Sequence, residues 1–525
     1  MADAWVKVAQ LKTSDSLRGR LSELGLELPV DDRILTAAEQ SPLARSLAIG
    51  GREVGNRWCI HPMEGWDAEL DGAPSEHTLR RWRNFGLSGA KWLWGGEAAA
   101  VQPDGRANPR QTLATADNEG GLRRLLETAR GAHRERFGSV DDWLCGLQLT
   151  HSGRYSKPEP GPLRPRTAWR HPLLDRRCGI EAGDDRPIWT DRDLEGLIDR
   201  YVAAAGVAVR VGFDFVDIKA CHGYLLHEFL GARGRPGPYG GDFAGRTRLL
   251  RTIIERVREE WPTLMIGVRL SFFDMIPFEA AAGPGRPSDF HAMLPYQYGF
   301  GVNESNPLEL DLAEPLRLVG ELERLGVVAV NLSCGSPYYN PHIQRPAAFP
   351  PSDGYQPPED PLVGVVRQIQ AVRKCKEAFP SMPIVGTGYS YLQDYLPHVA
   401  QAVVRAGWVD SVGLGRVVLS YPELPADCLQ MGQLRRKLVC RTFSDCTTGP
   451  RKGLISGCYP LDPYYKRMPA AESLRRLKAG DAAVNVAVNA VDGQSGGKAV
   501  GLSTSQAGGQ SDGQSGGNAG DERGR

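Results

Sequence analysis

The sequence predicts an α/β fold, a (β/α)8 TIM barrel with long loops on its C-terminal face and a disordered C-terminal tail. Eight apolar strand candidates alternate with helical segments, a pattern typical of parallel βαβ units. Titratable or glycine-rich segments follow the strand ends, where a closed barrel places its chemistry. Two long loops rich in Pro, Gly and aromatic residues, 272–307 and 336–360, also follow strands, as binding loops do. An open doubly wound sheet is possible, but eight such units in about 370 residues fit a closed barrel better.

The individual elements follow from local pattern. The central strand, 213–218, alternates and is rich in β-branched residues, and the helix at 75–85 begins after a Ser cap. The strand candidates in chain order are 56–60, 90–94, 143–153, 213–218, 264–270, 327–332, 382–387 and 409–415. The helix candidates are 75–85, 122–133, 194–206, 246–261, 314–326, 363–379 and 392–406.

Composition and length set the domain plan. We expect an N-terminal extension at 1–40, the barrel at 41–435, a cysteine-containing C-terminal segment at 436–480 and a disordered tail at 481–525. The tail is rich in Gly, Ser, Gln and Ala and contains the string DGQSGG twice, so it cannot bury enough apolar surface to order itself.

Charge and hydropathy exclude several classes of partner. The 525 residues include 63 Lys and Arg against 62 Asp and Glu, a formal net charge of +1. That balance gives no reason to expect nucleic acid or a membrane surface as partner. No apolar run approaches the ~18 residues of a membrane span, and the first residues lack an apolar signal core, so the cytoplasm is the expected location. The expected partner is a small-molecule substrate, with a homo-oligomer possible.

The central strand is followed by the densest group of reactive side chains. Lys219, Cys221, His222 and Tyr224 occur within six residues, just past the end of a buried strand. An α/β barrel places catalytic groups at this position. The alternative is a strand followed by an ordinary polar loop.

Four other strands carry candidate ligand contacts. Pro62 and Met63, in HPMEGW, could form a wall against a flat ring, and the small residues around Ala98, in GGEAAAV, would allow a close approach to the backbone. Gln148 offers both hydrogen-bond donors and an acceptor. Arg269 lies inside an apolar strand, where a guanidinium is costly unless it meets an anion or strong acceptors. The alternatives are an ordinary strand-exit turn at Pro62 and Met63 and tight packing around Ala98. For Gln148 the alternative is an amide that bridges two strands, and for Arg269 it is a structural salt bridge.

The last two strands suggest a phosphate site. GTGYSY at 386–391 resembles a dinucleotide fingerprint, but its sixth position is Tyr391 and its strand is the seventh of an array, so that interpretation is rejected. Gly388 follows strand seven, and Gly415 and Arg416 follow strand eight. Backbone N–H groups and a guanidinium at this position of a barrel commonly hold a phosphate.

Several of these motifs together resemble the old yellow enzyme family of FMN-dependent oxidoreductases. The resemblance covers roughly residues 40 to 465 and rests on HGYLLHEFL, the following YGG and Arg246, together with the strand-end motifs in the family's order. It implies an FMN site made of Pro62, Met63, Glu64, Ala98, Gln148, Arg269, Gly388, Gly415 and Arg416. It further implies that Lys219 and His222 hold a substrate carbonyl and that Tyr224 is the proton donor.

The function implied by the resemblance is transfer of hydride from NAD(P)H through FMN to an activated C=C bond of the enone or enoate type, or to a related acceptor. Glu64 and Lys219 depart from the family pattern. A carboxylate at 64 would disfavour an anionic reduced flavin, and an ammonium at 219 would favour a carboxylate-bearing substrate. An amine-dehydrogenase or demethylase-like barrel, similar to trimethylamine dehydrogenase, and a redox-inactive binding protein with the same fold are the alternatives.

Three cysteines near the C-terminus form a further candidate site. Cys440, Cys446 and Cys458 resemble part of the four-iron cluster motif of the dienoyl-CoA reductase branch. Val439 and Thr442 stand where further cysteine ligands are expected, and three thiolates fall short of the four that such a cluster needs. We therefore predict that no 4Fe-4S cluster forms. A cluster would need a fourth ligand, which only Cys428 or a non-cysteine side chain could supply. Reduced structural thiols and a zinc site are the other possibilities.

Overall fold

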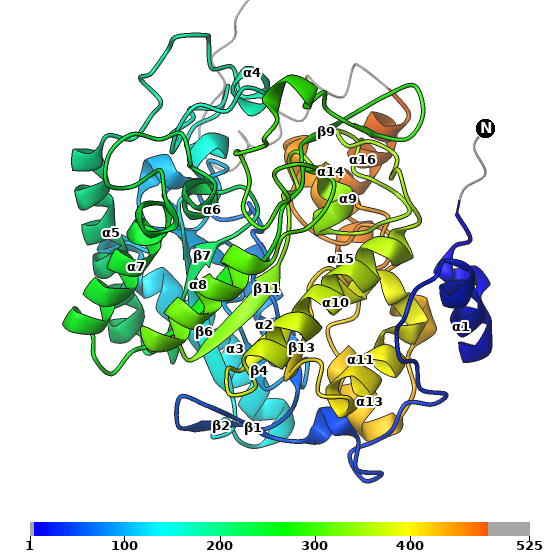
Figure 1. The fold of residues 1–525 in the computed structure, drawn as a ribbon. Coiled ribbons are helices and arrows are strands. Elements are labelled where there is room, and N and C mark those ends of the chain that lie inside the picture. The colour runs from blue at the N-terminus through cyan, green and yellow to red at the C-terminus, as the bar shows by residue number, and fades with distance from the viewer. Residues whose placement is uncertain (1–4, 481–525) are drawn as a thin grey trace, which may run out of the picture.

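The core of the molecule is a ring of eight parallel strands, seen in a computed structural model that describes residues 5–480 (Figure 1). The ring closes because β4 pairs with both β3 and β6, and β13 pairs with β3. In ring order the strands are β3 (Trp58–Ile60), β4 (Trp92–Leu93), β6 (Leu144–Thr150), β7 (Phe215–Ala220), β8 (Met265–Ser271), β11 (Ala329–Ser333), β12 (Ile384–Gly386) and β13 (Ser411–Leu414). The predicted (β/α)8 barrel is confirmed, and the tail predicted to be disordered lies outside the described residues.

Helices follow the strands and form the outer layer of the barrel (Figure 1). They are α2 (Glu76–Gly86), α3 (Glu119–Phe137), α5 (Asp191–Val211), α7 (Phe243–Glu260), α8 (Ala313–Arg324), α10 (Pro361–Ala378), α11 (Leu396–Arg405) and α13 (Leu424–Met431). In α2, the Ser75 side chain accepts hydrogen bonds from the first backbone N–H groups, and Trp82 and Phe85 are buried. The cap predicted from the sequence therefore starts this helix.

A hairpin absent from the predicted elements covers the bottom of the barrel. Strands β1 (Leu47–Ile49) and β2 (Arg52–Val54) pair across Gly50 and Gly51, both at positive φ. Such a two-residue turn suits the twist of a hairpin. Ile49 and Val54 are buried in one cluster with Trp92, Trp94 and Phe215 of the barrel interior. The ring is thus closed by apolar packing at this end, and its chemistry must lie at the other.

Several element boundaries differ from the sequence prediction by a few residues, and two elements also differ in how they are built. The second strand stops at Leu93, and the chain resumes as β5 (Ala98–Ala100), which pairs with β6. The helix predicted at 392–406 begins only at Leu396, after a 3-10 segment, Tyr389–Tyr395, in which Gln393 has a φ of 52°. Pro397 sits in the first turn of α11, where its missing N–H is tolerated.

Short elements cover the C-terminal face of the barrel. They are α4 (Leu174–Arg177), α6 (Leu225–Leu230), β9 (Phe278–Glu279), β10 (Arg286–Pro287), α9 (Pro341–Gln344), α12 (Val417–Ser420), α14 (Asp445–Arg451), α15 (Pro463–Lys466) and α16 (Pro469–Lys478). In Figure 1, α14 and α16 lie near α9 and β9 at this end, whereas α1 (Ser14–Glu23) lies at the outer edge of the molecule. None of the helices within residues 5–480 has the length and apolar character that crossing a membrane requires.

Candidate active site

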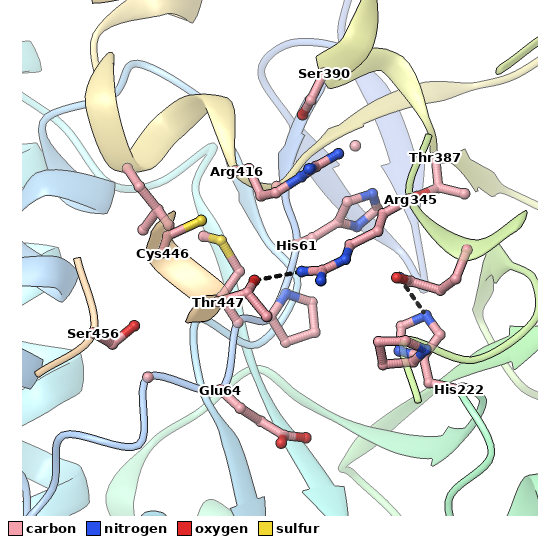
Figure 2. Close-up of a pocket in the computed structure, with 18 of the residues that line it drawn as sticks. His61, Glu64, His222, Arg345, Thr387, Ser390, Arg416, Cys446, Thr447 and Ser456 are labelled. Carbon is pink, nitrogen blue, oxygen red and sulfur yellow. Dashed lines mark hydrogen bonds between the residues drawn. The ribbon is translucent and has the colours of Figure 1, made fainter. Parts of the chain in front are cut away.

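A single cavity at the C-terminal ends of the strands brings the predicted residues together (Figure 2). All of the predicted catalytic and cofactor residues except Ala98 line it: Pro62, Met63, Glu64, Gln148, Lys219, His222, Tyr224, Arg269, Gly388, Gly415 and Arg416. Ala98 instead pairs with Gln148 in the β5–β6 ladder, and its carbonyl accepts a hydrogen bond from Gln111 Nε2 (2.8 Å). The flavin contact predicted for Ala98 stays a prediction.

The two departures from the family pattern form one ion pair. Lys219 Nζ donates a hydrogen bond to Glu64 Oε1, and the side chains are 4% and 11% exposed. Tyr224 Oη donates to the other carboxylate oxygen, Glu64 Oε2, at 2.7 Å. The Lys219 ammonium also lies 3.9 Å from the centroid of the Tyr224 ring. The ammonium is therefore matched by a carboxylate, which the sequence did not reveal.

Tyr224 belongs to a short chain of hydroxyl groups. The Tyr338 hydroxyl is 2.9 Å from Tyr224 Oη. Because Tyr224 has one hydroxyl hydrogen and gives it to Glu64, Tyr338 is the donor in this bond. Burial raises the pKa of Tyr224 well above its usual value, and the charge of Glu64 and the neighbouring Tyr338 raise it further. Tyr224 is therefore held as a neutral phenol.

His222 is held by backbone geometry and by two polar neighbours. Its φ is 66°, and it is followed by Gly223 at 76°, so the chain turns sharply after β7. The His222 Nε2 atom lies 2.7 Å from Ser333 Oγ and 3.3 Å from Gln344 Nε2. Burial, with the nearby charges of Arg269 and Lys219, lowers the pKa of His222 well below its usual value. The imidazole is therefore neutral at physiological pH.

The floor of the cavity is a row of hydrogen-bonded polar side chains. Gln148 Nε2 donates to Asp217 Oδ2 at 2.6 Å, and Asp217 Oδ1 accepts from the backbone N–H of Arg269 at 2.6 Å. Arg269 Nη1 lies 3.4 Å from the Pro62 carbonyl oxygen, while its Nε is buried without a partner. Burial raises the pKa of Asp217 to about 6. These bonds fix the orientation of Gln148 and hold Arg269 beside the strand-end turn that carries Met63.

The other end of the cavity is cationic. Arg416 follows β13, its Nη2 donates to the Pro346 carbonyl oxygen at 3.1 Å, and its Nη1 is buried without a partner. Figure 2 shows Arg345 reaching into the cavity, where its Nη1 donates to Thr447 Oγ1. Gly388, at a φ of 91°, forms part of the same wall. At this end of the cavity, Arg416 Nη1 and Arg345 Nη2 are therefore buried donors without an acceptor.

Sequence reasoning missed several lining residues. His61 begins the HPMEGW motif, contacts Asn331 Nδ2 through Nδ1 at 3.0 Å and has a buried Nε2 without a partner. Tyr338 and Arg345 lie in the long loop 336–360, which was singled out as a binding loop but not residue by residue. Thr447 and Ser456 come from the segment after the barrel. Apart from His61, which lies in HPMEGW, no local motif marks these residues.

The three C-terminal cysteines do not all face the cavity. Cys446 lines it, whereas Cys440 and Cys458 are buried nearby. Burial raises the pKa of Cys440 and of Cys458, and the charge of Cys446 adds to both shifts, which favours neutral thiols. Within residues 5–480, no group of three or more His, Cys, Asp or Glu side chains is arranged to hold a metal ion.

We predict that the protein carries no four-iron cluster, because its thiol set falls short of four ligands. Iron and acid-labile sulfide should both be near zero per chain after anaerobic purification. About four of each per chain would contradict this prediction.

Comparisons with known proteins agree with the fold. A family model described as the NADH:flavin oxidoreductase / NADH oxidase family matches residues 49–281. An NADH:flavin oxidoreductase of Gibberella zeae is 32% identical over 35% of this chain and 46% of its own length. An NADPH dehydrogenase of Clostridium acetobutylicum is 26% identical over 39% and 57%. The putative 12-oxophytodienoate reductase 12 of Oryza sativa subsp. japonica is 26% identical over 73% and 81%.

Solved structures share the architecture. The 2-naphthoyl-CoA reductase complex with 2-naphthoyl-CoA has a TM-score of 0.58 and 16% identity, over 81% of this chain and 57% of that one. The old yellow enzyme homologue from Zymomonas mobilis has a TM-score of 0.52 and 20% identity, over 76% and 96%. At these identities the likeness establishes the fold alone.

The fold is a (β/α)8 barrel, and residues 49–281 are similar to the flavin oxidoreductases that the family model describes. The resemblance to the old yellow enzyme family predicted from the sequence is confirmed by the family match and by the named relatives. The matched segments span about half the length of the first two relatives, 46% and 57%.

Proposed function

We propose that this protein is an FMN-dependent oxidoreductase that takes hydride from NAD(P)H and reduces an activated C=C bond. One observation carries the proposal: a single cavity has unpartnered guanidinium donors at one end and a Lys–Glu–Tyr group with a neutral His at the other. The first end suits a phosphate, and the second suits proton transfer beside a developing oxyanion.

The residues present fit FMN. Arg416 Nη1 is a buried donor without a partner beside the glycine-rich wall, as a phosphate site requires. The fixed Gln148 amide and the Arg269 guanidinium would meet the polar edge of the ring, and Met63 offers an apolar contact. Bound FMN would supply a two-electron carrier between the nicotinamide and the acceptor.

Residues of the chain would stabilise the negative charge on the acceptor and deliver a proton to it. Lys219 and the neutral His222 would orient the carbonyl oxygen and stabilise the negative charge that builds on it. Tyr224 would give its proton to the carbon next to the carbonyl. The Lys219 ammonium over the Tyr224 ring would stabilise the phenolate left behind, offsetting the repulsion from Glu64. Tyr338, which donates to Tyr224, is placed to return a proton.

The cofactor part of the proposal can be tested by colour. Arg416→Ala removes one charge-assisted contact to phosphate, which typically costs about 1.5–3 kcal/mol, roughly ten- to hundredfold in affinity. The wild-type protein should purify yellow with a flavin absorption band, and the variant should be folded but largely colourless at dilute concentration. Full flavin occupancy in the variant would mean that the phosphate lies elsewhere. A colourless wild type that cannot be reconstituted would favour a redox-inactive binding protein.

A further inference from the structure

Arg345 is a poorly compensated cation in the lining of the cavity. It follows α9, and the hydrogen bond recorded for its guanidinium goes to a neutral group, Thr447 Oγ1. Its Nη2 atom is buried and has no partner. A buried guanidinium nitrogen that has left water without gaining an acceptor is costly. The site is therefore incomplete without an acceptor at this position.

The neighbouring charges increase the demand for an anion. Burial lowers the pKa of Arg345, and the positive charges of Arg451 and Arg416 lower it further. Cys446 and the carboxylate of Asp353 act in the opposite direction, but both oxygens of Asp353 already accept hydrogen bonds from Arg451 Nη1, each at 2.7 Å. Positive charge around Arg345 thus exceeds the negative charge that the chain places there.

Arg416, close to Arg345, also has a buried guanidinium nitrogen without an acceptor. Its guanidinium donates to the carbonyl oxygen of Pro346, the residue next to Arg345, and its own Nη1 is buried without a partner. Figure 2 shows both guanidinium groups within the cavity. By contrast, Arg451 lines the same cavity with its terminal nitrogens satisfied, by Asp353 and by the Pro337 carbonyl oxygen (3.0 Å).

We propose that Arg345 and Arg416 form one anion-binding subsite that takes an oxyanion, a phosphate or a carboxylate, with Arg345 as its second guanidinium. The inference rests on the proposed function, which places a phosphate near Arg416. Two sources can supply the same chemistry: the terminal phosphate of FMN, or an anionic group on the acceptor. The ion pair between Lys219 and Glu64 assigns any preference for anionic acceptors to Arg345, because the Lys219 ammonium is already matched.

The first arm of the test separates phosphate from ring binding. The full-length protein, stripped of flavin, is titrated with FMN and with riboflavin by quenching of flavin fluorescence. Arg345→Gln should weaken FMN binding about ten- to hundredfold and leave riboflavin binding within about twofold. Arg345→Lys, which keeps the charge but loses the planar fork, should fall between Arg345→Gln and wild type. Arg80→Gln is the control, because its guanidinium is paired with Asp462 and is not part of this cavity lining, and it should leave the affinities for FMN and riboflavin similar to wild type.

The second arm of the test asks whether the anion bound by Arg345 belongs to the acceptor. The FMN-loaded protein is titrated with benzoate and with its neutral analogue benzamide, followed by the shift in flavin absorbance. If the occupant is the acceptor's anionic group, Arg345→Gln should leave FMN binding unchanged and weaken benzoate binding about tenfold or more relative to benzamide. If Arg345→Gln changes neither the affinity for FMN nor the affinity for benzoate, the proposed anion-binding subsite is wrong. Failure of the wild-type protein to bind either flavin would instead contradict the proposed function.

Discussion

Tyr224→Phe is expected to slow reoxidation of the reduced flavin by an enone about 10²–10⁴-fold, the usual contribution of a general acid. The variant keeps the ring under Lys219 and loses the hydroxyl that lies between Glu64 and Tyr338. Without that hydroxyl the carbon next to the carbonyl must take its proton from solvent. Reduction of the flavin by NAD(P)H needs no such proton and should stay within about twofold of wild type. Stopped-flow flavin absorbance follows the two half-reactions separately.

Tyr338→Phe is the matched control for this experiment. It removes the second hydroxyl of the chain but leaves Tyr224 bonded to Glu64. We expect it to slow reoxidation less than Tyr224→Phe, because it affects the return of the proton and not its delivery. Equal slowing of both half-reactions by Tyr224→Phe would remove the donor role and make Tyr224 a structural residue.

The second large effect is expected on stability, at the ion pair between Glu64 and Lys219. Removing one partner of a buried pair leaves an uncompensated charge and typically costs about 3–5 kcal/mol of unfolding free energy. Lys219→Met and Glu64→Gln should therefore each destabilise the protein, and the double variant should lose less than the sum of the two. Urea unfolding followed by tryptophan fluorescence measures all four proteins.

An exposed pair provides the control for this cycle. Arg33 and Glu39 form an ion pair with side chains 68% and 38% exposed, so Arg33→Gln should shift the unfolding midpoint far less than Lys219→Met does. Additive losses in the Glu64 and Lys219 cycle would show that the two side chains do not act as a pair. The hypothesis that their charges cancel would then fail.

Much of the fold was predictable because each strand and helix follows a local pattern. The central strand and the Ser-capped helix lie where the periodicity placed them, as β7 and α2. The β1–β2 hairpin at the bottom of the barrel was not predicted, although the glycine pair at 50 and 51 is a turn signal. The late start of α11 depends on the left-handed Gln393, which tertiary contacts select and no propensity predicts.

The cavity was predictable only in part. Residues at strand ends converge because a barrel brings all its strand ends to one face, which explains why Met63, Gln148 and Arg416 meet. Pairing between side chains is a different matter. The sequence treats Glu64 and Lys219 as two separate departures, yet they neutralise each other across 155 positions of chain. The importance of Arg345 was equally hidden, because the need for an anion arises from its neighbours in space and not in sequence.

The order in which the cavity's walls occur along the chain bears on its assembly during synthesis. The ring cannot close until β13 has been made, since β13 pairs with β3, and the wall around Thr447 and Ser456 comes later still. Before that point, the growing chain contains an open sheet whose two edge strands have unpaired backbone groups, and the proposed cofactor site is incomplete. Under the proposed function, we therefore expect flavin to stabilise the fold only after this last wall has been synthesised, because a ligand stabilises only the state that contains its complete site.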